Sequence, residues 1–174
     1  MVHTDQTGRF PVTSSRGHRY IMVLIEIDSN YIAMEPMKSR ETAEMIRAYR
    51  VIMDKLKHNG ITPKKQILDN EAPEAYKKTI KEYGLSWELV PPTNQRRLIA
   101  ERAIQTAKSH VIANLIGCDE SYPAREWHRL LPQIELTLNM LRPANVRPSV
   151  SAYMYIHGNH DYNKTPLAPL GCKT

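Results

Sequence analysis

One apolar run near the amino terminus limits the folds that this chain can adopt. Residues 19–28 are densely apolar and β-branched, which predicts a buried strand. Residues 30–37 are predicted to return beside it as a hairpin partner, with the turn at residues 28–30. Residues 2–6 predict a shorter strand before the pair, and the stretch from Gly8 to Gly17 supplies the turn residues between them. The amino-terminal part is therefore expected to form a sheet.

From Ser39 onward the apolar residues follow helical spacing. Ser39 is the expected cap, and the helix is expected to end at Asn59 and Gly60. The remaining expected elements are a strand over 66–69, a helix over about 72–83, a strand over 86–90, and helices over about 96–116, 122–141 and 149–156. Strands first, then alternating helices and strands, then helices predict an α/β protein whose mixed sheet is covered on both faces.

Composition and charge narrow the class of partner. The 174 residues suit one domain with a sizeable core. A net charge of +6 and a pI near 9.3 favour polyanionic partners, because phosphate neutralisation releases counterions. Cys118 and Cys172 cannot build a disulfide framework, so an intracellular protein is expected. No apolar run approaches the roughly 20 residues of a membrane span, and the amino terminus has no secretory pattern.

Three acidic residues occur in contexts that suggest one metal site. Asp5 lies in a strand-like stretch before Gly8, Asp69 ends the strand over 66–69, and Glu101 lies early on the long helix. Two Asp and one Glu from separate elements can hold a pair of Mg²⁺ or Mn²⁺ ions for displacement at a phosphodiester. The alternatives are ordinary: Asp69 followed by Asn70 suits a turn or a helix cap, and Glu101 suits a solvated surface.

A helical wheel places Glu101 at the margin of the long helix. At about 100° per residue, an apolar arc about 160° wide is formed by Ile99, Ala100, Ala103, Ile104, Ala107, Val111 and Leu115. Glu101 falls roughly 40° beyond the edge of this arc, with Lys108 between them. Glu101 is therefore expected at the boundary between core and solvent, where it could face a sheet edge.

The combined contexts are more specific than any one of them. His3-Thr4-Asp5-x-Thr7-Gly8, then a hairpin, then Leu68-Asp69-Asn70, then Pro92-x-Asn94 leading to Ala100-Glu101-Arg102, resemble in order and spacing the catalytic core of integrases from retroviruses and long-terminal-repeat retrotransposons of the copia-like kind. Further likeness lies in Trp127, Leu130 and Leu131, in Leu138-Asn139, and in Tyr155-Ile156-His157-Gly158. The resemblance covers residues 1–158 as the core, and residues 159–174 are similar to the Pro-rich connector that follows it.

This resemblance implies a fold, an activity and a set of site residues. The implied fold is ribonuclease-H-like, with a five-stranded mixed sheet flanked by helices. The implied activity is that of a polynucleotidyl transferase, which trims the 3′ ends of element DNA and joins them to target DNA in the nucleus, acting as a homo-oligomer. Asp5, Asp69 and Glu101 match the carboxylates that hold two Mg²⁺ or Mn²⁺ ions when DNA is bound, with Asp5 bridging them.

The long helix is also expected to contact DNA. Lys108 matches a basic position that contacts element DNA in the family. The alternative is an ordinary surface lysine whose aliphatic stem covers apolar surface while its ammonium stays in water. Arg97, Gln105 and Lys108 are expected to form a polar strip with Glu101 beside the apolar arc.

The chain also departs from the family pattern. Asn70 is followed by Glu71 where many members have Gly, and Asp69 and Glu101 are 32 positions apart (101 − 69), slightly fewer than usual. A zinc-binding domain before Asp5 and a basic domain after Thr174 are not present in the sequence, so weak activity is expected. Two alternatives stay open: a ribonuclease H with a fourth acid at Glu41 or Glu44, and a non-catalytic nucleic-acid-binding remnant of a decayed element.

Overall fold

A five-stranded mixed sheet forms the centre of the computed structural model, which describes residues 1–68, 72–89 and 95–171, with the backbone alone for 95–100. The strands are β1 (Val2–Gln6), β2 (Tyr20–Glu26), β3 (Tyr31–Met37), β4 (Lys65–Leu68) and β5 (Ser86–Leu89). They lie in the order β3-β2-β1-β4-β5. The first three are antiparallel neighbours, whereas β4 runs parallel to both β1 and β5. The predicted five-stranded mixed sheet is thus confirmed, with β1 at its centre.

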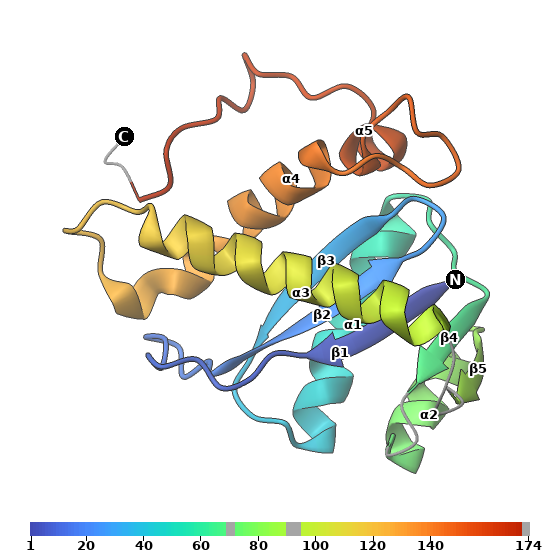
Figure 1. Ribbon diagram of the computed structural model, residues 1–174. Helices are drawn as coiled ribbons and strands as arrows, with labels where there is room; N and C mark the ends of the chain where they lie inside the picture. The colour runs from blue at the N-terminus through green and yellow to red at the C-terminus, as the bar shows by residue number, and fades with distance from the viewer. Residues whose placement is uncertain (69–71, 90–94, 172–174) are drawn as a thin grey trace.

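Helices cover both faces of this sheet (Figure 1). They are α1 (Thr42–His58), α2 (Glu74–Glu82), α3 (Gln95–Ile116), the 3₁₀ helix η1 (Ala124–Arg129), α4 (Leu131–Leu141) and α5 (Ala152–His157). Figure 1 shows α3 running across the front of the sheet over β1, with α1 behind it. Residues 159–171 run back along α4, where the Gln133 side-chain amide donates to the Ala168 carbonyl at 2.6 Å.

Successive side chains of β2 point to opposite faces of the sheet and so contribute to a hydrophobic core on each face. Met22 and Leu24 pack with Tyr49 and Ile52 of α1, whereas Ile21 and Val23 belong to the core beneath α3 and α4. All of these side chains are almost fully buried. Because successive strand residues point to opposite faces, a near-continuous apolar run is what a strand covered on both faces requires.

Two predicted helix boundaries were wrong. The helix expected over 122–141 is two helices, η1 and α4, that meet at Leu130. Pro132 lies in the first turn of α4, where a missing N–H costs nothing, whereas in a continuous helix it would break a hydrogen bond. The first helix begins after Glu41 rather than at Ser39. The Ser39 hydroxyl accepts the Glu41 N–H at 3.3 Å, so it forms a local turn and not the cap.

Candidate active site

Asp5 lies at the carboxyl end of the central strand, on the face that α3 covers. In β1, Val2 packs in the core beside α1 and α2, and the Thr4 hydroxyl lies 3.1 Å from the Tyr76 hydroxyl of α2. Alternation turns His3 and Asp5 to the opposite face. The Asp5 side chain is exposed, and its Oδ1 accepts the N–H of Gln6 at 2.7 Å. The carboxylate is therefore accessible from solvent beside α3.

Hydrogen bonds fix the chain immediately after Asp5. The Thr7 N–H donates to the Ile21 carbonyl and the Thr7 hydroxyl accepts the Ile21 N–H, both at 2.9 Å. The Arg40 guanidinium donates to the Thr7 carbonyl at 2.6 Å, and it also lies over the Tyr20 ring, 5.2 Å from the ring centroid. Every backbone polar group of Thr7 is thus bonded, which holds the end of β1 in one position.

Helix α3 presents the predicted apolar face to the sheet. Ala103, Ile104, Ala107 and Val111 are buried, as the wheel requires. Glu101 and Gln105 are exposed, and Lys108 is half-buried. The predicted DNA-binding residue Arg97 belongs to α3, but its side chain lies outside the described residues, as do those of Ile99 and Ala100.

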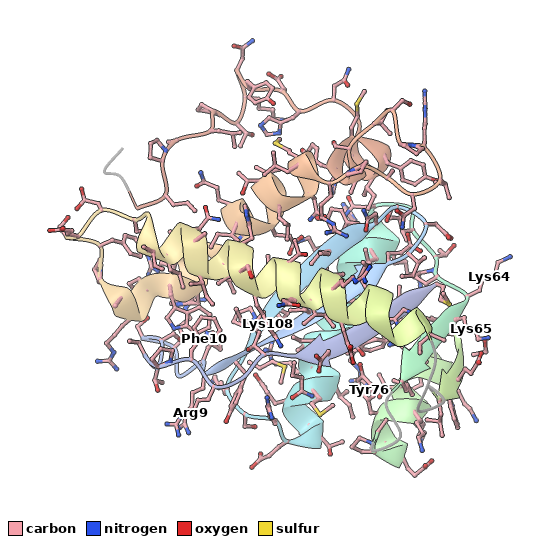
Figure 2. All side chains as sticks on the ribbon, viewed as in Figure 1. Arg9, Phe10, Lys64, Lys65, Tyr76 and Lys108 are labelled. Atoms are coloured by element: carbon pink, nitrogen blue, oxygen red, sulfur yellow. The ribbon has the colours of Figure 1, made fainter. Side chains whose placement is uncertain are left out.

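Glu101 and Lys108 lie on the same side of α3. Seven residues rotate the helix by about 700°, which is about 20° short of two full turns. Lys108 lines a cavity together with Thr7, Gly8 and Arg9, which directly follow β1. Figure 2 labels Lys108 on α3 and Arg9 on the loop. The side of α3 that carries Glu101 therefore faces, at Lys108, the loop that follows β1.

Asp69, the third predicted carboxylate, lies outside the described residues. The residues on either side of this gap are described. Leu68 and Ala72 line a cavity of about 330 Å³ together with Asp5. Tyr76 and Arg40 line it too, the former from α2 and the latter from the segment before α1. Residues at the carboxyl ends of β1 and β4 thus line the same cavity.

Arg40 was not among the predicted site residues. It lines the same cavity as Asp5, and its hydrogen bond to Thr7 joins residues 33 positions apart. The sequence offers no local signal for this contact, because it depends on how the segment between β3 and α1 crosses the end of β1. Arg9 had a detectable signal, since it directly follows Gly8 in the stretch that contains Asp5.

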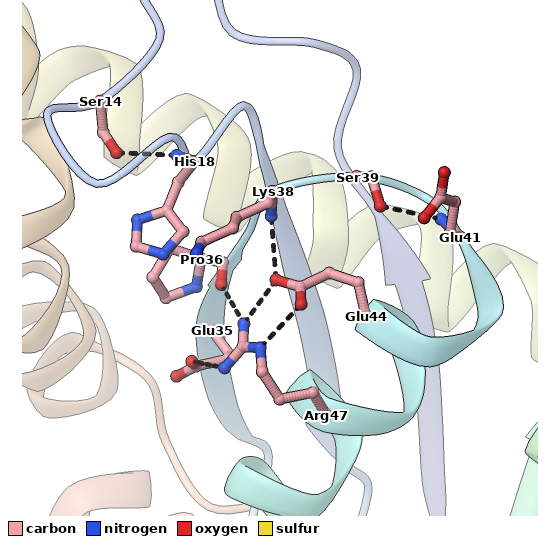
Figure 3. Close-up of polar contacts among 9 residues, drawn as sticks. All are labelled: Ser14, His18, Glu35, Pro36, Lys38, Ser39, Glu41, Glu44 and Arg47. Carbon is pink, nitrogen blue, oxygen red and sulfur yellow. Dashed lines mark hydrogen bonds and ion pairs between the residues drawn. The ribbon is translucent and has the colours of Figure 1, made fainter.

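Glu44 has a structural partner that weakens the ribonuclease H alternative (Figure 3). Its carboxylate accepts from Arg47 Nε at 3.0 Å and Nη2 at 2.9 Å, and from the Lys38 N–H at 2.9 Å. Arg47 also bonds Glu35 at 2.7 Å, which ties α1 to β3. Burial is the largest single influence on the Glu44 carboxyl and raises its pKa. The hydrogen bonds from Arg47 and from the Lys38 N–H together outweigh burial, so the pKa of Glu44 is lowered. Glu44 therefore anchors α1, and Glu41 is exposed at the helix start.

No group of three or more His, Cys, Asp or Glu side chains within residues 1–68, 72–89 and 95–171 is arranged to hold a metal ion. The predicted triad includes Asp69, which is not among these residues. In the same described part of the chain, no helix is long and apolar enough to cross a membrane.

Comparison with known proteins identifies the fold family that this structure resembles. No protein-family model matches the chain, and no curated protein matches it. Among solved structures, the catalytic core domain of BIV integrase superimposes with a TM-score of 0.65 and 16% identity, over 89% of this chain and 91% of that one. The chain has the integrase-core fold.

A second solved structure agrees with the first. It is a chain of the simian T-cell lymphotropic virus intasome, determined in complex with the PP2A regulatory subunit B56 gamma. The TM-score is 0.66 with 16% identity, over 97% of this chain and 56% of that one. The integrase-core fold, which is ribonuclease-H-like, accounts for the sheet order and for α3 lying across β1.

Proposed function

We propose that this chain is an integrase-type polynucleotidyl transferase core, which cleaves and joins DNA phosphodiester bonds with Mg²⁺ or Mn²⁺. The observation that carries the proposal is the relation between Asp5 and Glu101. One carboxylate is exposed at the end of the central strand, and the other is exposed on the side of α3 from which Lys108 meets the loop after that strand. The integrase-core fold supports the proposal independently.

Strand register supports Asp69 as the third carboxylate. Parallel pairing sets Val2 opposite Gln66 and His3 opposite Ile67. In the sequence Asp69 directly follows Leu68, the last residue of β4, which runs parallel to β1. In open α/β sheets, ligands bind beyond the carboxyl ends of strands.

The donor set fits hard divalent cations. Asp5, Asp69 and Glu101 offer carboxylate oxygens, the ligands that Mg²⁺ and Mn²⁺ prefer. Bound there, two ions would lower the pKa of an attacking water or 3′-hydroxyl and stabilise the leaving oxygen. The three carboxylates would hold and orient the ions, while Lys108 would contact a nearby phosphate. No side chain needs to act as a nucleophile.

DNA is the proposed substrate, as element ends and as target. The net charge of +6 favours a polyanion, and Lys108 and Arg40 lie near the proposed site. The similarity to an intasome chain supports assembly with further copies of the same protein on DNA. Action on target DNA inside the nucleus is part of the proposal. In this proposal residues 1–158 are the core and residues 159–174 connect it to a downstream region.

A cleavage and joining assay tests the proposal. The purified chain is incubated with supercoiled plasmid and with a labelled duplex that has a free 3′-hydroxyl, in Mg²⁺, Mn²⁺ or chelator. Metal-dependent nicking or joining is expected, and Asp5→Asn, Asp69→Asn or Glu101→Gln should abolish it without lowering the unfolding temperature by more than a few degrees. The matched controls Asp28→Asn and Glu120→Gln alter exposed acids elsewhere and should retain activity.

Two outcomes would contradict this function. Activity that persists in chelator, or equal activity in Asp69→Asn, would exclude the metal-dependent mechanism. Tight DNA binding without cleavage in any metal would favour the alternative, a nucleic-acid-binding protein that has lost catalysis.

A further inference from the structure

A second cavity lies next to the proposed site, between α3 and the loop after β1. Its volume is about 370 Å³, at the lower end of the range for small-molecule sites. Buried apolar residues of the sheet and of α3 line it: Ile21, Val23, Met34, Ala107 and Val111. Phe10 closes one side and is itself stacked on Trp127, with ring centroids 4.6 Å apart. The cavity is therefore bounded by the apolar face of the central sheet, by α3 and by the Phe10 ring.

The rim of this cavity is cationic. Lys108 lines it from α3 and Arg9 lines it from the loop. Within the described residues, the Lys108 ammonium has neither an ion-pair partner nor a hydrogen-bond partner, whereas Lys55, Lys65 and Lys77 are each paired with a Glu. An ammonium beside apolar walls favours a ligand that brings a negative group to the rim.

The lining argues against a nucleobase as the occupant. The hydroxyl of Thr7 is already the acceptor for the Ile21 N–H, and its carbonyl already accepts from Arg40. The Phe10 N–H donates to the Arg19 carbonyl at 2.7 Å. A base would bury several polar edge atoms without partners, which would weaken its binding. An apolar body has no polar atoms that would lose hydrogen bonds in the same space.

We propose that this cavity binds an anionic amphiphile, a small molecule with an apolar body and one terminal carboxylate or phosphate. The apolar body would lie against Ile21, Val23 and Met34, and the anionic group would meet Lys108. The regulatory consequence rests on the proposed function: since Lys108 is also the proposed phosphate contact, an occupied cavity competes with DNA for the same ammonium.

Methyl NMR of the complete chain tests binding without DNA or metal, so its failure is distinct from failure of the proposed function. Decanoate is the probe, used below its micelle-forming concentration. Saturable shifts are expected for the methyl groups of Ile21, Val23 and Met34. Decanol, which lacks the charge, should bind at least about tenfold more weakly, the factor expected when about 1.4 kcal/mol is lost. Acetate should cause no saturable shift of these methyl groups.

Three variants and one control test which residues bind the anionic group of the ligand and which bind its apolar body. Lys108→Met keeps an apolar stem and should reduce decanoate affinity to that of decanol, whereas Lys78→Met, on the exposed side of α2, should change nothing. Ala107→Leu fills the cavity and should abolish binding. Because Ala107 is fully buried and its variant could misfold, Ile112→Trp provides a second block: Ile112 is 54% exposed at the rim, so the fold should persist while affinity falls.

Several outcomes would overturn the inference. Absence of saturable shifts at the three methyl groups excludes the site, as does unchanged affinity in folded Ile112→Trp. Equal affinities for decanoate and decanol exclude the anionic requirement. Decanoate binding that leaves the affinity for a DNA duplex unchanged excludes the competition.

Discussion

The side-chain amide of Asn139 on α4 makes two hydrogen bonds to the backbone of Ile32 on β3. The Ile32 N–H donates to Oδ1 at 2.8 Å, and Nδ2 donates to the Ile32 carbonyl at 2.7 Å. One helical turn earlier, the Glu135 carboxylate accepts the Met34 N–H at 2.9 Å. Because β3 is the last strand on its side of the sheet, these side chains occupy backbone groups that would otherwise pair with another strand.

We therefore expect Asn139→Leu to destabilise the protein. Two buried backbone groups of Ile32 would lose their partners, at a cost of about 2–4 kcal/mol in the free energy of unfolding. Urea denaturation monitored by circular dichroism measures this loss, and Asn159→Leu, at an exposed position in the tail, is the matched control. A loss no larger than that of the control would show that the edge of β3 does not depend on Asn139.

Glu135 and Tyr31 should be energetically coupled. The Tyr31 hydroxyl donates to Glu135 at 2.7 Å, and both residues are buried. Burial, and after it the Glu135 carboxylate, raises the pKa of Tyr31. A double-mutant cycle with Tyr31→Phe and Glu135→Gln should give a coupling energy of about 1.5–3 kcal/mol, typical of a hydrogen bond to a charged group. Strict additivity of the two variants would contradict the contact.

How far the sequence predicts this molecule depends on whether a feature is local. The strands over 2–6 and 20–37 follow from apolar runs that no helix pattern explains, and the apolar arc of α3 follows from spacing alone. The division of the helix over 122–141 was missed because Trp127, Leu130, Leu131 and Ile134 are apolar at helical spacing on both sides of the break. Pro132 was the available signal.

The candidate site follows the same rule. Asp5 and Glu101 were identified from their immediate neighbours, whereas Arg40 depends on a contact with Thr7 that only the folded chain creates. The hydrogen bonds between Asn139 and Ile32 join residues 107 positions apart, and no periodic pattern in the sequence indicates them. Helices and strands are thus predictable where periodicity defines them, and contacts between them are not.

Acid should destabilise the protein through His18. The rings of His18 and His128 lie with centroids 5.4 Å apart, and His18 Nδ1 and both ring nitrogens of His128 are buried without hydrogen-bond partners in the described part of the chain. Burial first, and then His128, Arg47 and Lys38, lower the pKa of His18 from 6.5, against a raising effect of Glu44. The unfolded chain therefore binds more protons below pH 6.5, so stability is complete above that pH and falls as the pH decreases.

Urea denaturation at several pH values between 7.5 and 5 measures this effect. His18→Phe removes the titrating group, so its free energy of unfolding should fall less steeply with acid than that of the wild type. His58→Phe, at an exposed position in the last turn of α1, should retain the wild-type slope. The same steep decline in His18→Phe would assign the acid sensitivity to other groups.

Lys108 provides the clearest test of DNA contact by α3. An ammonium that meets a phosphate contributes electrostatically and positions the backbone without distinguishing bases. Lys108→Ala should therefore weaken binding about equally for duplexes of different sequence, and it should reduce the slope of log K against log salt concentration by about one unit. Fluorescence anisotropy at several salt concentrations measures both quantities. Lys78→Ala removes an exposed charge from α2 and should leave the slope unchanged. If the two variants behave alike, Lys108 is an ordinary surface lysine, and the DNA path does not follow this side of α3.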